Sequence, residues 1–364
     1  MTESDVAATL GLGSAALGRT LTDPVPLGGS TRSLVLRART SDGTSVVIKH
    51  FEPDGGGATG EDGDGAYRRE AAGLAHLDHT PDLLAADPAA RLVVMTDAGS
   101  APTLADLLRG ADPDVARAAS ARWARALGDL CGGSSSAVGA VASAIGETAD
   151  PGIETRIRAG LDAIARVSGA VVPKGLEAEL AVVLGLLEDR GVLVASPGDT
   201  CPDNALLEPD GRVVFLDLEG TDVHHPALDA AYALLPFATC WCVYEPPPGF
   251  VEDLLTEFTT GLAAHLPEVA ADPRWPGQVR TACLGWLLMM TGILLKYTED
   301  PERRMGPKDS PALTFREHVL LRWRWGTRHL AADFPAATAF LADAVAGVER
   351  DWGALRPAGY PAFG

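Results

Sequence analysis

The segment that decides the fold reads SPGDTCPDNALL from Ser196 to Leu207, and the strand VVFLD follows from Val213 to Asp217. The run EPDG between them is a turn, so the two apolar stretches form a β-hairpin. Asp199 and Asn204 lie on the loop before this hairpin, which returns Asp217 beside them. Magnesium prefers such oxygen ligands, and phosphoryl transfer also needs a free carboxylate as base. We therefore predict Asp199 as the catalytic base and Asn204 and Asp217 as metal ligands.

Three further features precede this segment in a fixed order. A turn rich in glycine and hydroxyl groups comes first, at residues 25–32. Lys49 ends a β-branched strand, and Glu70 lies near the start of a helix expected over residues 67–76. In protein kinases a strand lysine grips the nucleotide phosphates and a helix glutamate holds that lysine in place. The order predicts a nucleotide site upstream of the hairpin.

The first hundred residues have mostly strand patterns, and the remainder has mostly helical periodicity. Asp42-Gly43 predicts a hairpin turn within residues 41–44, because glycine accepts the positive φ of a tight turn. A loop is expected over residues 52–65. Thr103 and Asp106 form a capping box that opens the first helix of the second part. This pattern predicts an α+β fold with a β-rich lobe over residues 1–98 and a helical lobe over residues 99–364.

These motifs resemble those of the aminoglycoside phosphotransferase and choline kinase-like family. The family signature runs His-Gly-Asp, four residues, Asn, and then a strand ending in Ile-Asp-Trp/Phe-Glu/Asp. Residues 197–204 match its first part, with Pro197 in place of the histidine, and residues 215–219, FLDLE, match its second part. Residues 225–231, HPALDAA, are similar to the family's Asp-Pro-x-x-Asp-Leu-Ala segment, in which the second aspartate, here Asp229, is usually structural. The resemblance covers roughly residues 20–235.

The resemblance implies a bilobal protein kinase-like fold that uses ATP or GTP together with Mg²⁺. It places the adenine at the strand and hinge of residues 91–99. The family histidine normally supports the catalytic loop, so its replacement by Pro197 affects loop geometry more than chemistry. The implied nucleotide-binding residues are Gly28, Gly29, Ser30, Thr31, Lys49, Glu70, Met95, Asp97 and Ala98.

Composition narrows the classes of partner. The chain has 364 residues, 46% of them hydrophobic, which suits a globular protein of two lobes. Its formal net charge of −19 disfavours nucleic acid and anionic membranes as partners. The longest apolar run, Cys283–Leu295, is shorter than the ~20 residues of a membrane-spanning helix. We predict that this run is a buried core helix and has no membrane role.

The five cysteines are odd in number and widely scattered. We expect reduced, buried thiols in a cytoplasmic protein without a signal peptide. Cys240 and Cys242 flank a tryptophan, but a single C-x-C without a second pair is weak evidence for zinc. The cysteines are Cys131, Cys201, Cys240, Cys242 and Cys283.

The acceptor site is less well defined by sequence. Family resemblance puts it between the catalytic loop and the helices after Asp229. A basic stretch over residues 303–329 contains Trp323 and Trp325. We interpret it as a helix with core tryptophans and locally paired arginines; the alternative is a surface for an anionic or peptidic acceptor, or for a protein partner. Candidate residues around the acceptor are Glu219, Asp222, His224, His225, Glu252 and Asp253.

Three functions fit these observations. The first is a kinase that phosphorylates a hydroxyl of a small molecule, such as an aminoglycoside-like antibiotic or a natural-product intermediate. The second is a peptide Ser/Thr kinase in the biosynthesis of a modified peptide. The third, suggested by Pro197, is a pseudokinase that binds nucleotide or a partner protein without turnover. The chain retains the predicted lysine, glutamate, catalytic base and metal ligands, which argues against the third function.

Overall fold

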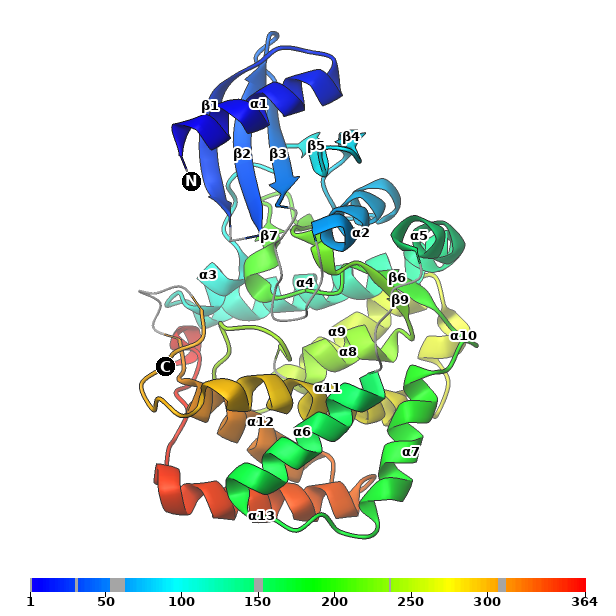
Figure 1. Cartoon of the computed structure of the whole chain (residues 1–364). Coiled ribbons are helices and arrows are strands. Elements are labelled where there is room, and N and C mark those ends of the chain that lie inside the picture. The colour runs from blue at the N-terminus through cyan, green and yellow to red at the C-terminus, as the bar shows by residue number, and fades with distance from the viewer. Residues whose placement is uncertain (1, 30–31, 53–62, 147–152, 236, 307–311) are drawn as a thin grey trace.

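The computed structural model describes residues 2–29, 32–52, 63–146, 153–235, 237–306 and 312–364. The N-terminal part is built on a five-stranded antiparallel sheet with the order β1-β2-β3-β5-β4 (Figure 1). The predicted hairpin turn joins β2 and β3, and Gly43 has a φ of 85° there. The strands are β1 (Leu21–Gly29), β2 (Ser33–Thr40), β3 (Ser45–Phe51), β4 (Leu83–Asp87) and β5 (Leu92–Thr96).

A helix covers each face of this sheet. Side chains alternate between the faces of a strand, and Ile48 packs in one apolar cluster with α1 (Glu3–Leu17). Its neighbour Val47 packs in the other cluster, which includes residues of α2 (Gly63–His76). The helix α2 places Glu70 below the sheet, where the sequence pattern expected it. The helix α1 was not expected; its capping box, formed by Thr2 and Asp5, is the signal that marks its start.

The prediction of a turn over residues 25–32 is wrong for residues 25–29, which belong to β1. Prolines usually exclude a central strand because they cannot donate a ladder hydrogen bond. Here Pro24 and Pro26 lie on an edge strand, where this restriction is relaxed, and the register shifts on both sides of the pair Val25–Pro26. The loop predicted over residues 52–65 also ends earlier than expected, because α2 begins at Gly63; residues 53–62 lie outside the described residues.

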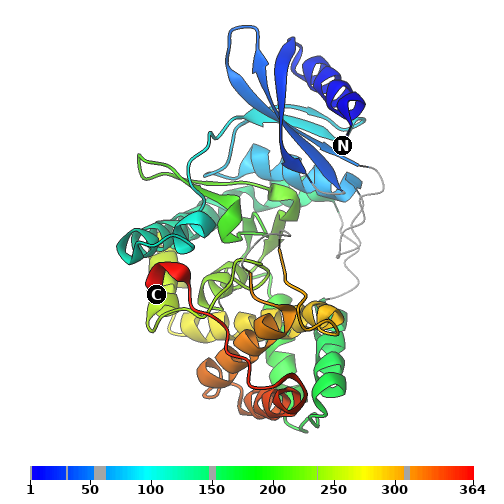
Figure 2. The same cartoon turned by 90° about the vertical axis from the view of Figure 1, so that its left-hand side faces the viewer.

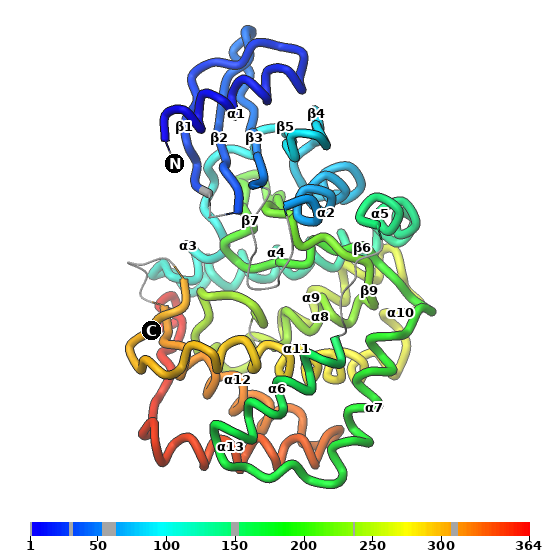
Figure 3. The backbone as a smooth tube through the Cα atoms, viewed as in Figure 1, coloured from blue at the N-terminus to red at the C-terminus, as the bar shows by residue number. Residues whose placement is uncertain are grey.

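The rest of the chain is mainly helical and lies on one side of the sheet (Figure 2). The backbone leaves the sheet after β5 and runs directly to α3 (Figure 3). One large apolar core joins these helices, and it includes the fully buried Trp123. The helices are α3 (Leu104–Leu108), α4 (Pro113–Gly133), α5 (Val138–Ile145), α6 (Ile153–Ser168), α7 (Leu176–Leu187), α8 (Ala227–Leu234), α9 (Phe250–Ala263), α10 (Pro267–Ala270), α11 (Trp275–Leu294), α12 (Phe315–His329) and α13 (Pro335–Trp352).

Four short strands interrupt the helices between residues 194 and 224. β7 (Ala205–Leu207) and β8 (Val213–Phe215) form the predicted hairpin. β6 (Val194–Ser196) pairs with β9 (Asp222–His224). A sheet-based N-terminal part followed by a helical part confirms the predicted two-lobed α+β class.

The apolar run at residues 283–295 lies in α11 and its continuation. Trp275–Tyr297 is long and apolar enough to cross a membrane by length and composition alone. However, 72% of an apolar 18-residue stretch of this helix is buried inside the protein. It packs against α6, α7, α8 and α12. The prediction of a buried core helix is therefore confirmed.

Candidate functional site

Lys49, on β3, lies at the centre of a buried ion cluster. Its Nζ atom donates a hydrogen bond of 2.7 Å to Oε2 of Glu70 on α2, contacts Oδ1 of Asp217, and lies 3.5 Å from Oε2 of Glu219. Burial alone would lower the pKa of Lys49, but the three carboxylates raise it, so the ammonium stays charged. Burial raises the pKa of Glu70 to about 7, against the attraction of Lys49. The structure thus brings together three residues predicted separately from the sequence.

Asp217 follows β8 in a left-handed conformation, with φ 60° and ψ 65°. Non-glycine residues adopt this conformation at a cost of about 1–3 kcal/mol and usually where the surroundings impose it. Burial would raise the pKa of Asp217, but Lys49 holds it below its ordinary value. The turn directs an ionised carboxylate toward the lysine at the end of the predicted hairpin.

Asp199 lies half-buried in the loop between β6 and β7. Its Oδ1 atom accepts hydrogen bonds from Oγ1 of Thr239 at 3.2 Å, the amide of Cys201 at 3.3 Å and the hydroxyl of Tyr232 at 3.4 Å. Burial, followed by the negative charges of Asp217 and Asp203, raises the pKa of Asp199 to about 6. A carboxylate in this range can accept a proton near neutral pH.

Asn204 connects this loop to the hairpin. Its Nδ2 atom donates to the carbonyl oxygen of Asp199 at 3.3 Å, and its own carbonyl oxygen accepts from the amide of Leu216 at 2.7 Å. The second bond holds Asn204 against the residue that precedes Asp217. The convergence predicted for these side chains is therefore a consequence of hairpin pairing.

Asp229, on α8, holds the start of the loop of residues 196–204, which the sequence predicts to be the catalytic loop. Its Oδ1 accepts from Oγ of Ser196 at 2.5 Å, and its Oδ2 is 2.8 Å from Nε2 of His224. The Ser196 hydroxyl also accepts from the amide of Gly198 at 3.0 Å. These bonds surround Pro197, which stands where the resembled family has histidine. They hold the backbone on both sides of Pro197 in place.

The ion cluster opens into a cavity of about 420 Å³. The predicted residues Met95, Asp97 and Ala98 line it on the hinge side. The Asp97 side chain is already engaged, at 2.7 Å from Nε of Arg37 and 2.6 Å from Oγ of Ser45, so the backbone is left to contact a ligand. Lys49, Glu70, Asn204 and Asp217 complete the predicted set around this cavity.

The glycine-rich turn has a less direct relation to the cavity. Gly28 and Gly29 end β1, whereas Leu27, Arg32 and Ser33 are the lining residues described at this edge. Ser30 and Thr31 lie outside the described residues. Binding by the turn therefore stays a prediction.

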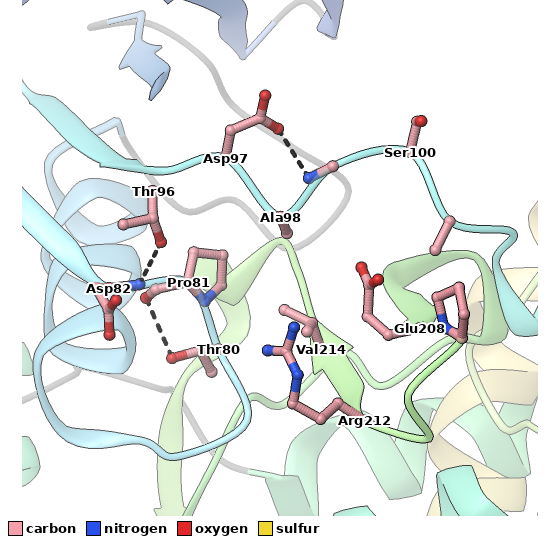
Figure 4. Close-up of a pocket in the computed structure, with 13 residues that line it drawn as sticks. Thr80, Pro81, Asp82, Thr96, Asp97, Ala98, Ser100, Glu208, Arg212 and Val214 are labelled. Carbon is pink, nitrogen blue, oxygen red and sulfur yellow. Dashed lines mark hydrogen bonds between the residues drawn. The ribbon is translucent and has the colours of Figure 1, made fainter. Parts of the chain in front are cut away.

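A second cavity of about 630 Å³ lies on the other side of the hinge (Figure 4). Asp97 turns away from its centre, toward the amide of Gly99 at 2.9 Å, and Arg212 and Glu208 enter it from the β7–β8 turn. None of the ion cluster lines this space, although it is the larger of the two. The ion cluster lines the smaller cavity.

The acids proposed around the acceptor are placed differently from one another. Glu219 lines the cavity of the ion cluster, where its Oε1 lies 2.8 Å from Nη2 of Arg32. Asp222 lies 3.6 Å from Nη1 of Arg69. Glu252 and Asp253 are exposed in the first turn of α9. Arg32 and the hydroxyl contacts to Asp199 were not predicted, because their partners are distant in sequence.

The basic stretch is used mainly inside the protein. Trp323 and Trp325 are buried in the core, and Arg322 donates to the carbonyl oxygens of residues 237 and 238. Arg324 and Arg328 pair with Glu349 and Glu245, at 2.6 and 2.7 Å. The prediction of core tryptophans is confirmed, whereas the arginines described here contact acids and carbonyl groups that are distant in sequence.

The expectation of reduced cysteines throughout is wrong. Cys201 and Cys240 form a disulfide, with Cα atoms 5.2 Å apart and a sequence separation of 39 residues. The catalytic loop and the segment after α8 meet in the fold, and spacing alone does not show this. Cys131, Cys242 and Cys283 are buried and free, as predicted.

No family model and no curated protein sequence matches this chain. Solved structures do match it in shape. An amicoumacin kinase, determined with AMP-PNP, Ca²⁺ and amicoumacin, has a TM-score of 0.51 at 12% identity, over 90% of this chain and 97% of that one. The chain has the protein kinase-like fold. The bilobal kinase-like architecture implied by the sequence motifs is thereby confirmed.

Two further structures are similar over most of their length. The macrolide 2′-phosphotransferase of Brachybacterium faecium has a TM-score of 0.48 and 20% identity, and the match covers 94% of this chain and 98% of that chain. An ethanolamine kinase of Plasmodium vivax has a TM-score of 0.48 and 11% identity, with coverage of 88% and 83%.

Proposed function

We propose that this protein is a phosphotransferase that moves the γ-phosphate of ATP or GTP to a hydroxyl group of a small molecule. The ion cluster of Lys49, Glu70 and Asp217 near the half-buried carboxylate of Asp199 is the observation that carries this proposal. Phosphoryl transfer depends on positioning and on electrostatic stabilisation more than on covalent chemistry by the protein. The cluster offers one fixed cation, and a separate carboxylate lies near enough for the charge of Asp217 to raise its pKa.

Each residue has a defined part in the proposed reaction. Lys49 contacts phosphate oxygens, and Glu70 holds its ammonium group in place. The backbone of residues 97–98 contacts the purine at the hinge. Asp199 accepts the proton of the acceptor hydroxyl, since its pKa of about 6 leaves it ionised at neutral pH.

The residues present also fit a magnesium ion. Asn204 and Asp217 offer an amide oxygen and a carboxylate oxygen, which are the hard ligands that Mg²⁺ prefers. The carboxylates of Asp199 and Asp217 lie close enough to raise the pKa of Asp199, so the cleft has negative charge for a cation to neutralise. When bound, Mg²⁺ would offset charge on the β- and γ-phosphates.

A small acceptor is favoured over a peptide or a protein partner. Arginines of the basic stretch over residues 303–329 already contact acids and carbonyl groups of the same chain, which leaves less of the stretch for an anionic or peptidic acceptor. The first acceptors to test are amicoumacin, macrolides and ethanolamine, as named for the structural neighbours, together with aminoglycosides, which the sequence motifs suggest. Both lobes, divided at residues 98 and 99, contribute residues to the proposed site, and we propose the cytoplasm as its location.

Nucleotide consumption measured with a panel of such acceptors tests this function. We expect acceptor-dependent release of ADP or GDP by the wild-type chain. Asp199→Asn should lower kcat/KM by about 10²–10⁴-fold, the usual contribution of a general base. Asp343→Asn, on the exposed face of α13, is the matched control and should retain wild-type turnover. Turnover that survives Asp199→Asn contradicts the assigned base, and tight nucleotide binding without turnover favours the pseudokinase.

A further inference from the structure

Three sulfur atoms and a carboxylate gather directly beside the catalytic loop. Cys201 and Asp203 come from the loop itself, and Cys240 and Cys242 come from the segment after α8. One ligand atom from each residue lies within 4.8 Å of all the others. The Sγ atoms of Cys240 and Cys242 are 2.7 Å apart, although only Cys240 is joined to Cys201. Three of the four residues are buried, so the group is shielded from bulk water.

A disulfide explains only two of these four groups. It leaves the thiol of Cys242 against the bonded pair and gives no role to Asp203. The Oδ1 atom of Asp203 is buried and has no hydrogen-bond partner among the residues that the structure describes, while its Oδ2 accepts from Nε1 of Trp241 at 2.5 Å. An unpartnered buried carboxylate oxygen is costly unless a donor or a cation satisfies it. Here the free oxygen belongs to the same group as the three sulfurs.

We propose that these four residues, once the disulfide is reduced, bind one zinc-like divalent cation in a tetrahedral Cys₃Asp site. A phosphine supplies two electrons to the disulfide and becomes the phosphine oxide with the oxygen of a water molecule, whose two protons complete the two thiols. The three thiols then lose three protons to solvent as the cation binds their sulfurs and Oδ1 of Asp203. Thiolate and carboxylate ligands in this number are typical of structural zinc.

The geometry and the charge of the cluster suit such an ion. Zinc–sulfur bonds of about 2.3 Å in a tetrahedral site put sulfur atoms about 3.8 Å apart, so the cysteines need only small side-chain rotations. Trp241 acts as the outer partner that orients the ligating carboxylate. Three thiolates, one carboxylate and one divalent cation leave a net charge of −2. The guanidinium of Arg109, at 5.5 Å from the centroid of the Trp241 ring, offsets part of it.

Such a site would fix the catalytic loop to the segment that contacts its base. Cys201 is two residues after Asp199, and Asp203 precedes Asn204. The other two ligands flank Trp241, close in sequence to Thr239, which donates to Asp199. This positioning role rests on the proposed function, whereas metal binding itself does not.

The test is a zinc titration of the full-length chain, reduced with a phosphine under anaerobic conditions and without nucleotide. Excess Mg²⁺ saturates the oxygen sites, and a chromophoric chelator competes for Zn²⁺. We expect one equivalent of Zn²⁺ per chain, and Co²⁺ in its place should give thiolate charge-transfer bands and tetrahedral d–d bands. Cys242→Ser keeps the residues of the disulfide and should weaken binding by more than about 100-fold. Trp241→Phe should weaken it by about 10–100-fold, as expected for an outer partner.

Cys131→Ser and Cys283→Ser are the matched controls, because both cysteines are buried and neither belongs to the cluster. Both variants should bind one equivalent as tightly as the wild type. Denaturation midpoints, measured for every variant, identify any that fails to fold; Asp203→Asn then replaces Cys242→Ser as the test. A reduced wild-type chain that takes up no Zn²⁺, or equal affinity in the folded cluster variants, would overturn the proposal and leave a disulfide only.

Discussion

A β-carbon at position 198 would lie 1.9 Å from the carbonyl oxygen of Gly220, and the φ of Gly198 is +78°. Both facts require glycine immediately before the proposed base. Gly198→Ala should therefore displace the catalytic loop, abolish most phosphotransfer and lower the free energy of unfolding by about 1–3 kcal/mol for the backbone strain alone. Chemical denaturation and steady-state kinetics measure the two effects.

Gly211 provides the matched control for Gly198. Its φ is +95°, but no atom lies within 4 Å of the position of an added β-carbon. Gly211→Ala should thus show the cost of a left-handed alanine without the overlap, with activity retained. Equal losses in the two variants would show that the contact between Gly198 and Gly220 is unimportant.

Glycines determine how closely α4 and α9 approach each other. A β-carbon on Gly128 of α4 would lie 2.0 Å from the carbonyl oxygen of Phe258 on α9. Gly128→Ala should force these helices apart and destabilise the protein by about 1–3 kcal/mol, as overpacking usually does. Gly185→Ala, on α7 with open space around it, should instead stabilise by about 0.5–1 kcal/mol. Thermal unfolding of both variants gives the comparison, and a stable Gly128→Ala would contradict the close packing.

Elements were predictable where the signal was local. The hairpin of β7 and β8 follows from its turn and its apolar strands, and it accounts for the position of Asp217 beside Asn204. The strand β1 was missed because its prolines imitate a turn unless the strand is known to lie at an edge. The contact of Thr239 with Asp199 joins residues 40 apart, and no local pattern indicates it.

Over the whole chain, the order of the sequence motifs was more informative than the spacing between them. The succession of lysine strand, glutamate helix, hinge and hairpin predicted both the two-lobed class and the residues that meet around Lys49. The cysteines show the opposite case, since their scatter favoured free thiols while the fold joins Cys201 to Cys240. Contacts such as this disulfide join segments about 40 residues apart. They form only when the chain folds, so a single sequence gives no local signal for them.

Lys49 connects the sheet to the helical part, because Glu70 and Asp217 approach it from different parts of the chain. Lys49→Met should lower the free energy of unfolding by about 3–5 kcal/mol at pH 8, since it leaves a buried carboxylate without its partner. Glu70 already has a pKa raised to about 7 by burial, and loss of Lys49 raises it further. The native state then binds more protons than the unfolded state above pH 4.5, so stability falls as pH rises.

The loss of unfolding free energy in Lys49→Met should accordingly be smaller at pH 6 than at pH 8. At pH 8 the buried Glu70 must either carry an unpaired charge or take up a proton from a solution of low proton concentration. Lys49→Met/Glu70→Gln removes the titrating group and should restore part of the stability at pH 8, with a flatter pH profile. Urea denaturation of the two variants and the wild type at both pH values measures this. Equal destabilisation of the single variant at pH 6 and 8, without recovery in the double variant, would mean that Glu70 is not the buried charge that Lys49 compensates.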